Sequence, residues 1–171
     1  MKHPLLSKTF PVALFAVAAL GLSACGFTPL YGPQTVTKGL GAIEVVADEG
    51  RAGYLLREKL DDVLARNPNL LPAYRLSYKL SEKRYARGVR VDNVANRYEL
   101  NLTAYWTLTD IKTSKAVRSG TTAAAVTYDS ADQPYASITA QQDSQERAAA
   151  EVARKIQLDL ATWLAGGKPT T

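Results

Sequence analysis

The sequence has little of the side-chain chemistry on which most enzymes depend, because its 171 residues include one histidine and one cysteine. The histidine, His3, precedes an apolar run from Phe10 to Leu22 that has the character of an export signal. Once that segment is removed no histidine remains, which excludes a histidine-containing triad and a Cys/His metal site. One cysteine also excludes an intramolecular disulfide. We therefore expect a protein that is not an enzyme and that needs neither cofactor nor metal.

Long hydrophobic runs are also missing, since Phe10–Leu22 is shorter than the stretch of about 20 apolar residues that a permanent membrane-spanning helix requires. The positive residues Lys2 and Lys8 before this run are typical of a cleaved signal peptide. The run ends in Leu22-Ser23-Ala24-Cys25, which resembles the lipobox of bacterial lipoprotein precursors. We predict cleavage after residue 24 and lipidation of Cys25, which would anchor the chain to a membrane through several acyl groups.

The expected layout is a single domain. Residues 1–24 are the signal peptide, 25–40 a lipidated tether, 41–167 the folded domain and 168–171 a tail. The glycines and prolines of the tether predict little regular structure there. A domain of this length buries roughly 70% of the surface that its unfolded chain exposes, which is enough for a real core.

Two alternating stretches predict a sheet. In Tyr74–Lys83 the even positions up to Leu80 are Tyr or Leu and the odd positions are Arg, Ser or Lys. In Tyr98–Thr109 the even positions are Tyr, Leu, Ala or Trp, and the odd ones are polar apart from Tyr105. A period of two over this length is typical of strands with one buried face and one solvated face.

The remaining pattern completes an α+β fold. We predict a strand over 42–46, a helix over 51–67, a strand over 116–128 and a helix over 136–165. Gly120 is interpreted as a bulge that switches the alternation of its strand. The expected architecture is a two-layer sandwich, with two helices packed on one face of a four-stranded mixed sheet in the order β-α-β-β-β-α. A right-handed crossover should make the first two strands parallel.

Basic residues are concentrated in the strands. Ten Lys or Arg and four Asp or Glu lie between Arg75 and Arg118. One interpretation is a solvated face whose lysines protect an edge strand from aggregation. The other is a platform for an anionic partner, for which guanidinium groups suit phosphate. Export and lipid tethering argue against nucleic acid. The candidate anion contacts, chosen by charge and strand parity, are Arg75, Lys79, Lys83, Arg87, Arg90 and Arg118.

Several segments resemble a known family. The stretch Cys25–Gly32 resembles the start of mature lipopolysaccharide-assembly lipoproteins (LptE), in particular the shorter alphaproteobacterial type. Tyr128–Ala136, Gln141–Asp143 and Glu146–Ala149 are similar to the end of the last strand and the final helix of that family. Arg97–Leu100 is also similar.

The resemblance implies an outer-membrane lipoprotein that faces the periplasm. Its implied partners are the β-barrel translocon LptD, whose lumen it plugs, and lipopolysaccharide, whose insertion in the outer leaflet it assists. Family members bind lipopolysaccharide with basic residues near the loop before the third strand and near the start of the last helix. Arg90 lies close to the first region, whereas the second reads Ala140–Asp143 and has no basic residue.

Two other functions stay open at the level of sequence. One is an auxiliary lipoprotein of an envelope lipid transporter. The other is an envelope hydrolase that uses carboxylates or a serine, which requires titratable groups gathered in a cleft. The plug is favoured because a polar sheet face matches the polar interior of a large barrel.

The charge pattern gives a first prediction. Replacing Arg90 and Lys79 together by Asp should abolish binding of purified lipopolysaccharide to the folded domain, since two phosphate-binding cations would become anions. A pull-down with immobilised lipopolysaccharide measures this, and unchanged binding would refute the assigned contacts.

Overall fold

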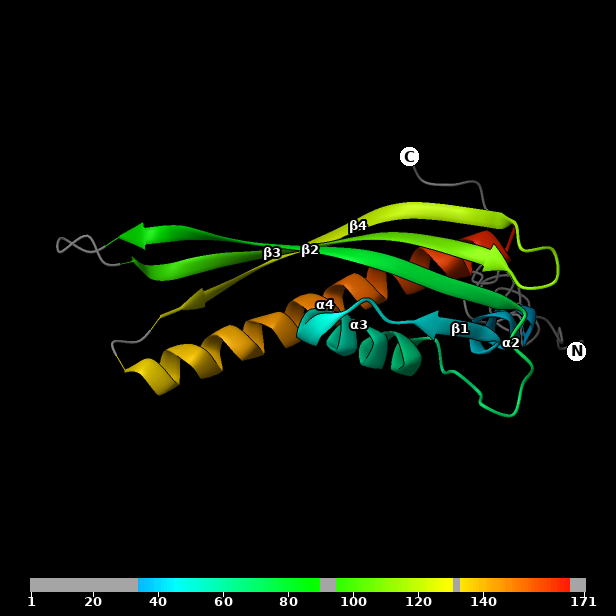
Figure 1. Ribbon diagram of the computed structural model, residues 1–171, viewed down its shortest axis with the longest axis horizontal. Helices are drawn as coiled ribbons and strands as arrows, with labels where there is room; N and C mark the ends of the chain where they lie inside the picture. Colours follow the sequence, from blue (N-terminus) through cyan, green and yellow to red (C-terminus); the bar gives the residue numbers. More distant parts are fainter. Residues whose placement is uncertain (1–33, 90–94, 131–132, 167–171) are drawn as a thin grey trace, which may run out of the picture.

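One four-stranded sheet organises the chain in the computed structural model, which describes residues 34–89, 95–130 and 133–166 (Figure 1). The sheet order is β1-β2-β3-β4, with β1 parallel to β2 and the other pairs antiparallel. Helices α3 and α4 pack on one face. The predicted α+β fold is confirmed. The elements are α2 (Gln34–Gly41), β1 (Ile43–Val46), α3 (Gly50–Val63), β2 (Tyr74–Val89), β3 (Ala95–Asp110), β4 (Ala116–Asp129) and α4 (Pro134–Leu164).

The alternation in β2 and β3 divides the sheet into two chemically different faces. Leu76 pairs with Leu108, and both are fully buried on the helix side. Lys79, of the opposite parity, is exposed, and Thr103 on the same side is half-buried. Burial of apolar surface on one side therefore fixes the register, because a slip by one residue would exchange the two faces.

The molecule is elongated because its longest elements run side by side (Figure 1). β2 and β3 have 16 residues each, which corresponds to about 50 Å at about 3.3 Å per residue. α4 has 31 residues and a length of about 45 Å. The predicted end of β2 at Lys83 was too early, since the strand continues through a more polar stretch to Val89.

The core lies between the sheet and the helices. Trp106 of β3 is buried beside α4, whose inward stripe includes Val152, Ile156 and Leu160. Tyr78 of β2 donates a buried hydrogen bond of 2.9 Å from its hydroxyl to the Gly53 carbonyl of α3. In the part of the chain that the structure describes, no helix combines the length and apolar character needed to cross a bilayer.

The second half of the predicted tether is helical, which corrects the prediction of little regular structure over 25–40. α2 places Val36 and Leu40, one helical turn apart, in the core. Its Gly39 lies against the side chain of Leu164 near the end of α4. The pair was missed because the glycines and prolines around it dominate the local pattern, whereas packing against α4 stabilises the helix.

Gly120 is not the predicted bulge. The irregularity in the β3–β4 register lies between the pairs Leu108–Arg118 and Thr109–Ala116. Gly120 is instead paired with Trp106, and a Cβ added there would lie 2.6 Å from Cζ2 of the indole. The glycine therefore lets the ring lie against the β4 backbone, where its Nε1 donates a 3.0 Å hydrogen bond to Thr122 Oγ1.

This packing predicts that Gly120→Ala destabilises the domain. The methyl group has to displace a rigid ring in a filled core, so the free energy of unfolding should fall by about 1–3 kcal/mol. Urea denaturation of a chain that begins at Gly26 measures the change. Ser119→Ala, on the exposed side of the same strand, is the matched control and should have little effect; equal stability of the two variants would contradict the packing argument.

Candidate functional site

The face of the sheet opposite the helices is not covered by any of the described helices (Figure 1). We call it the bare face, and it consists of the odd-numbered residues of β2 and β3 with their neighbours on β4. Its side chains are mostly hydroxyls, with Tyr105 exposed at its centre. The central members are Ser77, Lys79 and Ser81 of β2, Thr103, Tyr105 and Thr107 of β3, and Ser119 and Thr121 of β4.

Tyr105 stands between two shallow hollows of the bare face. The larger, of about 440 Å³, lies toward β4 and is bordered by Lys79, Thr107 and Thr121. The smaller, of about 160 Å³, lies toward β2 and is bordered by Ser77 and Lys79. Both are open and lined by polar and apolar atoms alike, which suits docking of a protein surface rather than enclosure of a small molecule.

Three of the predicted anion contacts on the bare side are held in ion pairs. Arg75 Nε lies 3.0 Å from Glu44 Oε2, and Lys79 Nζ lies 2.8 Å from Asp48 Oδ1. Arg87 binds both carboxylate oxygens of Glu99, at 2.8 and 3.0 Å. The positive charge predicted for this row is therefore largely neutralised by acidic residues that lie outside it or on the adjacent strand.

The other predicted anion contacts do not share one location or one kind of partner. Lys83 is exposed on the bare face and has no ion-pair partner among the described residues. Arg118 lies on the helix side, opposite Leu108, because the even-numbered residues of β4 face the helices without interruption from Arg118 to Tyr128, and it is ion-paired with Asp159 of α4. The change of parity predicted at Gly120 does not occur. Arg90 and the predicted lipidation site Cys25 lie outside the described residues. The structure therefore does not gather the six cations into one site.

Asp48, which the sequence did not single out, organises one edge of the bare face. Besides the ammonium group of Lys79 it accepts the backbone N–H of Leu80 at 2.9 Å and that of Glu49 at 3.0 Å. The hydrogen bond from Lys79, followed by that from Leu80, lowers the pKa of the Asp48 carboxyl. The Asp48 carboxylate thereby accepts a hydrogen bond from a backbone N–H of β2 that lies just beyond the end of β1. Nothing in the local sequence links residues 48 and 80.

A second group of polar contacts joins the far end of the sheet to α4. The guanidinium of Arg84 lies 5.1 Å from the ring centre of Tyr98 and donates a 3.0 Å hydrogen bond to Gln141. Glu82 accepts hydrogen bonds of 3.0 Å from Gln145. These even-numbered residues of β2 take positions where apolar core would be expected. We call this group the polar seam.

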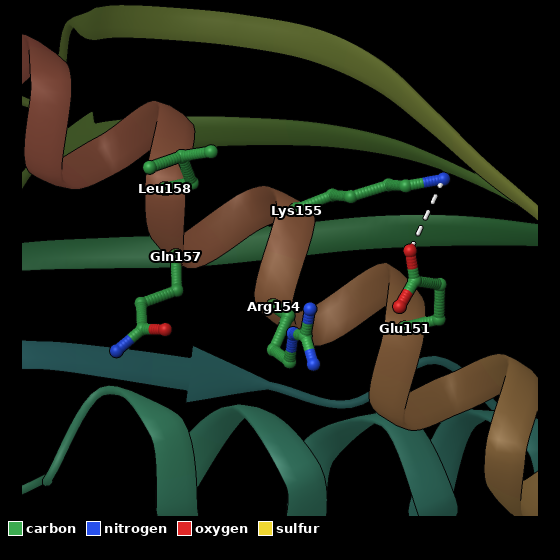
Figure 2. Close-up of a pocket in the computed structure, with 5 residues that line it drawn as sticks. All are labelled: Glu151, Arg154, Lys155, Gln157 and Leu158. Carbon is green, nitrogen blue, oxygen red and sulfur yellow. Dashed lines mark ion pairs between the residues drawn. The ribbon is translucent and has the colours of Figure 1, made fainter.

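A pocket of about 240 Å³ on α4 does not form a second candidate site (Figure 2). Lys155 pairs with Glu151 at 3.5 Å and donates to the carbonyl of Ala123 on β4 at 2.9 Å. Gln157 donates to the carbonyl of Val63, the last residue of α3. These side chains connect α4 to its neighbours and do not converge on a common point, so they offer no arrangement for catalysis.

Comparison with known proteins identifies relatives over most of the described fold. The family model described as "LptE: Lipopolysaccharide-assembly" matches residues 40–160. A crystal structure of a protein assigned as a lipoprotein of Caulobacter crescentus CB15 is 61% identical, with a TM-score of 0.68, and the match covers 77% of this chain and 96% of that one. A search of the curated proteins gave no match.

More distant structures share the fold. The rare lipoprotein B of Shewanella oneidensis is 12% identical, with a TM-score of 0.55, and the match covers 72% of this chain and 95% of that one. A lipoprotein B of Nitrosomonas europaea is 10% identical, also with a TM-score of 0.55, over 73% and 84% of the two chains. At these identities the likeness concerns the fold alone.

The environment of Asp48 predicts the pH dependence of its ion pair. In the folded protein the pKa of the Asp48 carboxyl lies below its ordinary value of 3.8. The ion pair therefore stabilises the folded state above the unfolded pKa, and this stabilisation is lost as pH falls through the folded pKa. NMR titration of the carboxyl carbon should show this low pKa. Lys79→Met should raise it, and Lys83→Met, which removes an unpaired charge, should leave it nearly unchanged. Equal shifts in both variants would contradict a specific pair.

Proposed function

This chain belongs to the lipopolysaccharide-assembly (LptE) family, and from that membership we propose that it is an outer-membrane lipoprotein that binds to and plugs an LptD-type β-barrel. In this role it faces the periplasm, is anchored through lipid on Cys25, binds lipopolysaccharide and assists its insertion in the outer leaflet. Membership of a family of assembly lipoproteins agrees with the expectation that the chain is not an enzyme.

The observation that supports the plug most directly is the chemistry of the bare face. The interior of a large outer-membrane barrel is polar, and a protein surface that fits it needs donors and acceptors rather than an apolar patch. Ser77 of β2, Thr107 of β3 and Thr121 of β4 provide hydroxyls over three adjacent strands. The sheet that carries them is elongated and twisted, and it is suited to lie along a curved barrel wall (Figure 1).

The ion pairs at the margin of the bare face support the same role. Enclosing an isolated charge in an interface costs several kcal/mol, because the charge loses its hydration. Arg75, Lys79 and Arg87 already have carboxylate partners within 3.0 Å. Apart from Lys83, the cations of this face can therefore be enclosed by a second protein with their partners already in place, while the hydroxyls form new hydrogen bonds.

Lipopolysaccharide contact is proposed at the cations that remain available. Lys83 is exposed and has no acidic partner among the described residues, and Arg90 follows it in sequence toward the β2–β3 connection. Phosphate groups are bound by such side chains through charge-assisted hydrogen bonds. The paired cations Arg75, Lys79 and Arg87 contribute less, since a phosphate has to compete with a carboxylate already in place.

Site-specific crosslinking in intact cells tests the proposed docking. A photoreactive residue at Tyr105, at the centre of the bare face, should capture a large outer-membrane β-barrel, because the side chain would lie against the barrel wall. The matched position is Glu58, exposed on α3, from which we expect much weaker capture of that protein. Mass spectrometry of the crosslinked species identifies the partner.

Two results would contradict the proposal. Capture of the barrel from Glu58 but not from Tyr105 would show that the helices form the interface. Capture of inner-membrane transporter subunits from Tyr105 would favour the alternative of an auxiliary lipoprotein of an envelope lipid transporter.

A further inference from the structure

Two leucines are exposed at the loop between α3 and β2. Leu71 is 92% exposed and Leu70 41% exposed, between Pro68 and Pro72. Leu71 is the most exposed large apolar side chain of the described residues. Neither leucine extends the core, although the local chain has a defined conformation. An apolar pair held out in this way needs a partner that covers it.

Backbone hydrogen bonds fix the loop to the start of the domain. Asn67 donates from its N–H to the Gly41 carbonyl at 3.2 Å, and Ala73 donates to the Ala42 carbonyl at 2.9 Å. Within the loop, Leu70 N–H donates to the Asn67 carbonyl at 3.0 Å. The leucines are thus presented on a tied loop next to the junction of α2 and β1, so little conformational entropy is lost when they bind.

The loop lies at the end of the molecule where the chain enters the fold. In Figure 1, α2, this loop and the β3–β4 turn all lie at the same end, and the first turn of α4 lies at the other. Nine residue steps separate Cys25 from Gln34, the first residue of α2, which allows at most about 30 Å in an extended chain. Lipid attached to Cys25 would therefore hold this end close to the membrane surface.

Exposed basic residues lie on the elements at the same end of the molecule as the leucines. The β3–β4 turn contacts the loop through the hydrogen bond from Ile111 N–H to the Ala73 carbonyl, at 3.1 Å. Of the acidic residues at this end, Glu44 pairs with Arg75 and Asp61 pairs with Arg57. Asp62 and Asp110 remain, and the Asp110 carboxylate is occupied by the N–H and hydroxyl of Thr113. Exposed cations outnumber them: Lys38 on α2, Arg66 in the loop, and Lys112 and Lys115 in the turn.

We propose that the Leu70–Leu71 loop is a second membrane contact, which docks on the phospholipid surface beside the anchor. This inference rests on the lipid anchor in the proposed function. Apolar side chains enter the boundary between headgroups and acyl chains by about 5–10 Å, and nearby Lys and Arg bind anionic headgroups. The two leucines with their basic surroundings have this composition. Docking would orient the long axis of the domain, with the polar seam directed away from the bilayer.

Depth-dependent quenching tests the contact. Because Cys25 is the only native cysteine and would be acylated, Leu71→Cys gives the lipoprotein one reactive thiol for an environment-sensitive fluorophore. The protein is placed in vesicles of phosphatidylethanolamine and phosphatidylglycerol that contain nitroxide lipid. We expect the nitroxide to remove most of the emission at residue 71. Tyr135→Cys is the matched control, because Tyr135 is 87% exposed at the opposite end, and its label should be unquenched.

The charges give an independent test. Replacing Arg66 and Lys112 by Gln should lower the ratio of docked to undocked label by about fivefold per charge on these anionic vesicles, and much less on vesicles of phosphatidylcholine. Equal losses on both would contradict electrostatic docking.

Flotation of the same samples separates the two proposals. Failure to float with vesicles contradicts the anchor, and the docking with it. Flotation with an unquenched residue 71 contradicts the docking alone. A label that is shielded only when the barrel is present would assign the loop to a protein interface and overturn the membrane contact.

Discussion

The structure depends on burying one face of a sheet and not the other. Leu76, Leu102 and Leu108 meet the helices on one side, while Lys79 and Thr103 remain on the other. Since strand side chains alternate strictly, the apolar residues that stabilise the core also determine which polar residues form the bare face. The proposed docking surface is thus a direct consequence of how the domain folds, and a change in strand register would abolish both.

Charge on the bare side is arranged for enclosure rather than for attraction over distance. The basic row along β2 looks in sequence like a strong positive field, but Glu44, Asp48 and Glu99 pair with most of it. At such exposed positions each pair adds little to stability. Their main consequence is a nearly neutral, hydrogen-bonding surface. Within the described part of the chain, Lys83 is the cation of this surface that stays unpaired.

The sequence was sufficient for features that arise from local periodicity. The alternation in β2 and β3 and the apolar stripe of α4 predicted the sheet, its polarity and its helical cover. The sequence was insufficient where residues distant in the chain determine the structure. α2 is stabilised by packing on α4, Gly120 makes room for the indole of Trp106, and Asp48 is held by Lys79 and Leu80. Strand parity placed Arg118 on the wrong face because the change of alternation predicted at Gly120 is absent, and the β3–β4 pairing runs without a shift from Arg118 to Asp129.

The two ends of the molecule differ in how firmly they are held, and this fits the work proposed for each. At the end that carries α2, the core leucines, α2 and the tied α3–β2 loop form one well-packed unit. At the other end none of the α4 residues from 134 to 143 is buried, and the helix is joined to the sheet mainly through the polar seam of Arg84, Gln141 and their neighbours. Regions with few buried apolar contacts open at lower free energy than a core. A firmly packed base and a far end that opens more easily fit the proposed plug, in which one end sets the orientation and the other meets the lipid.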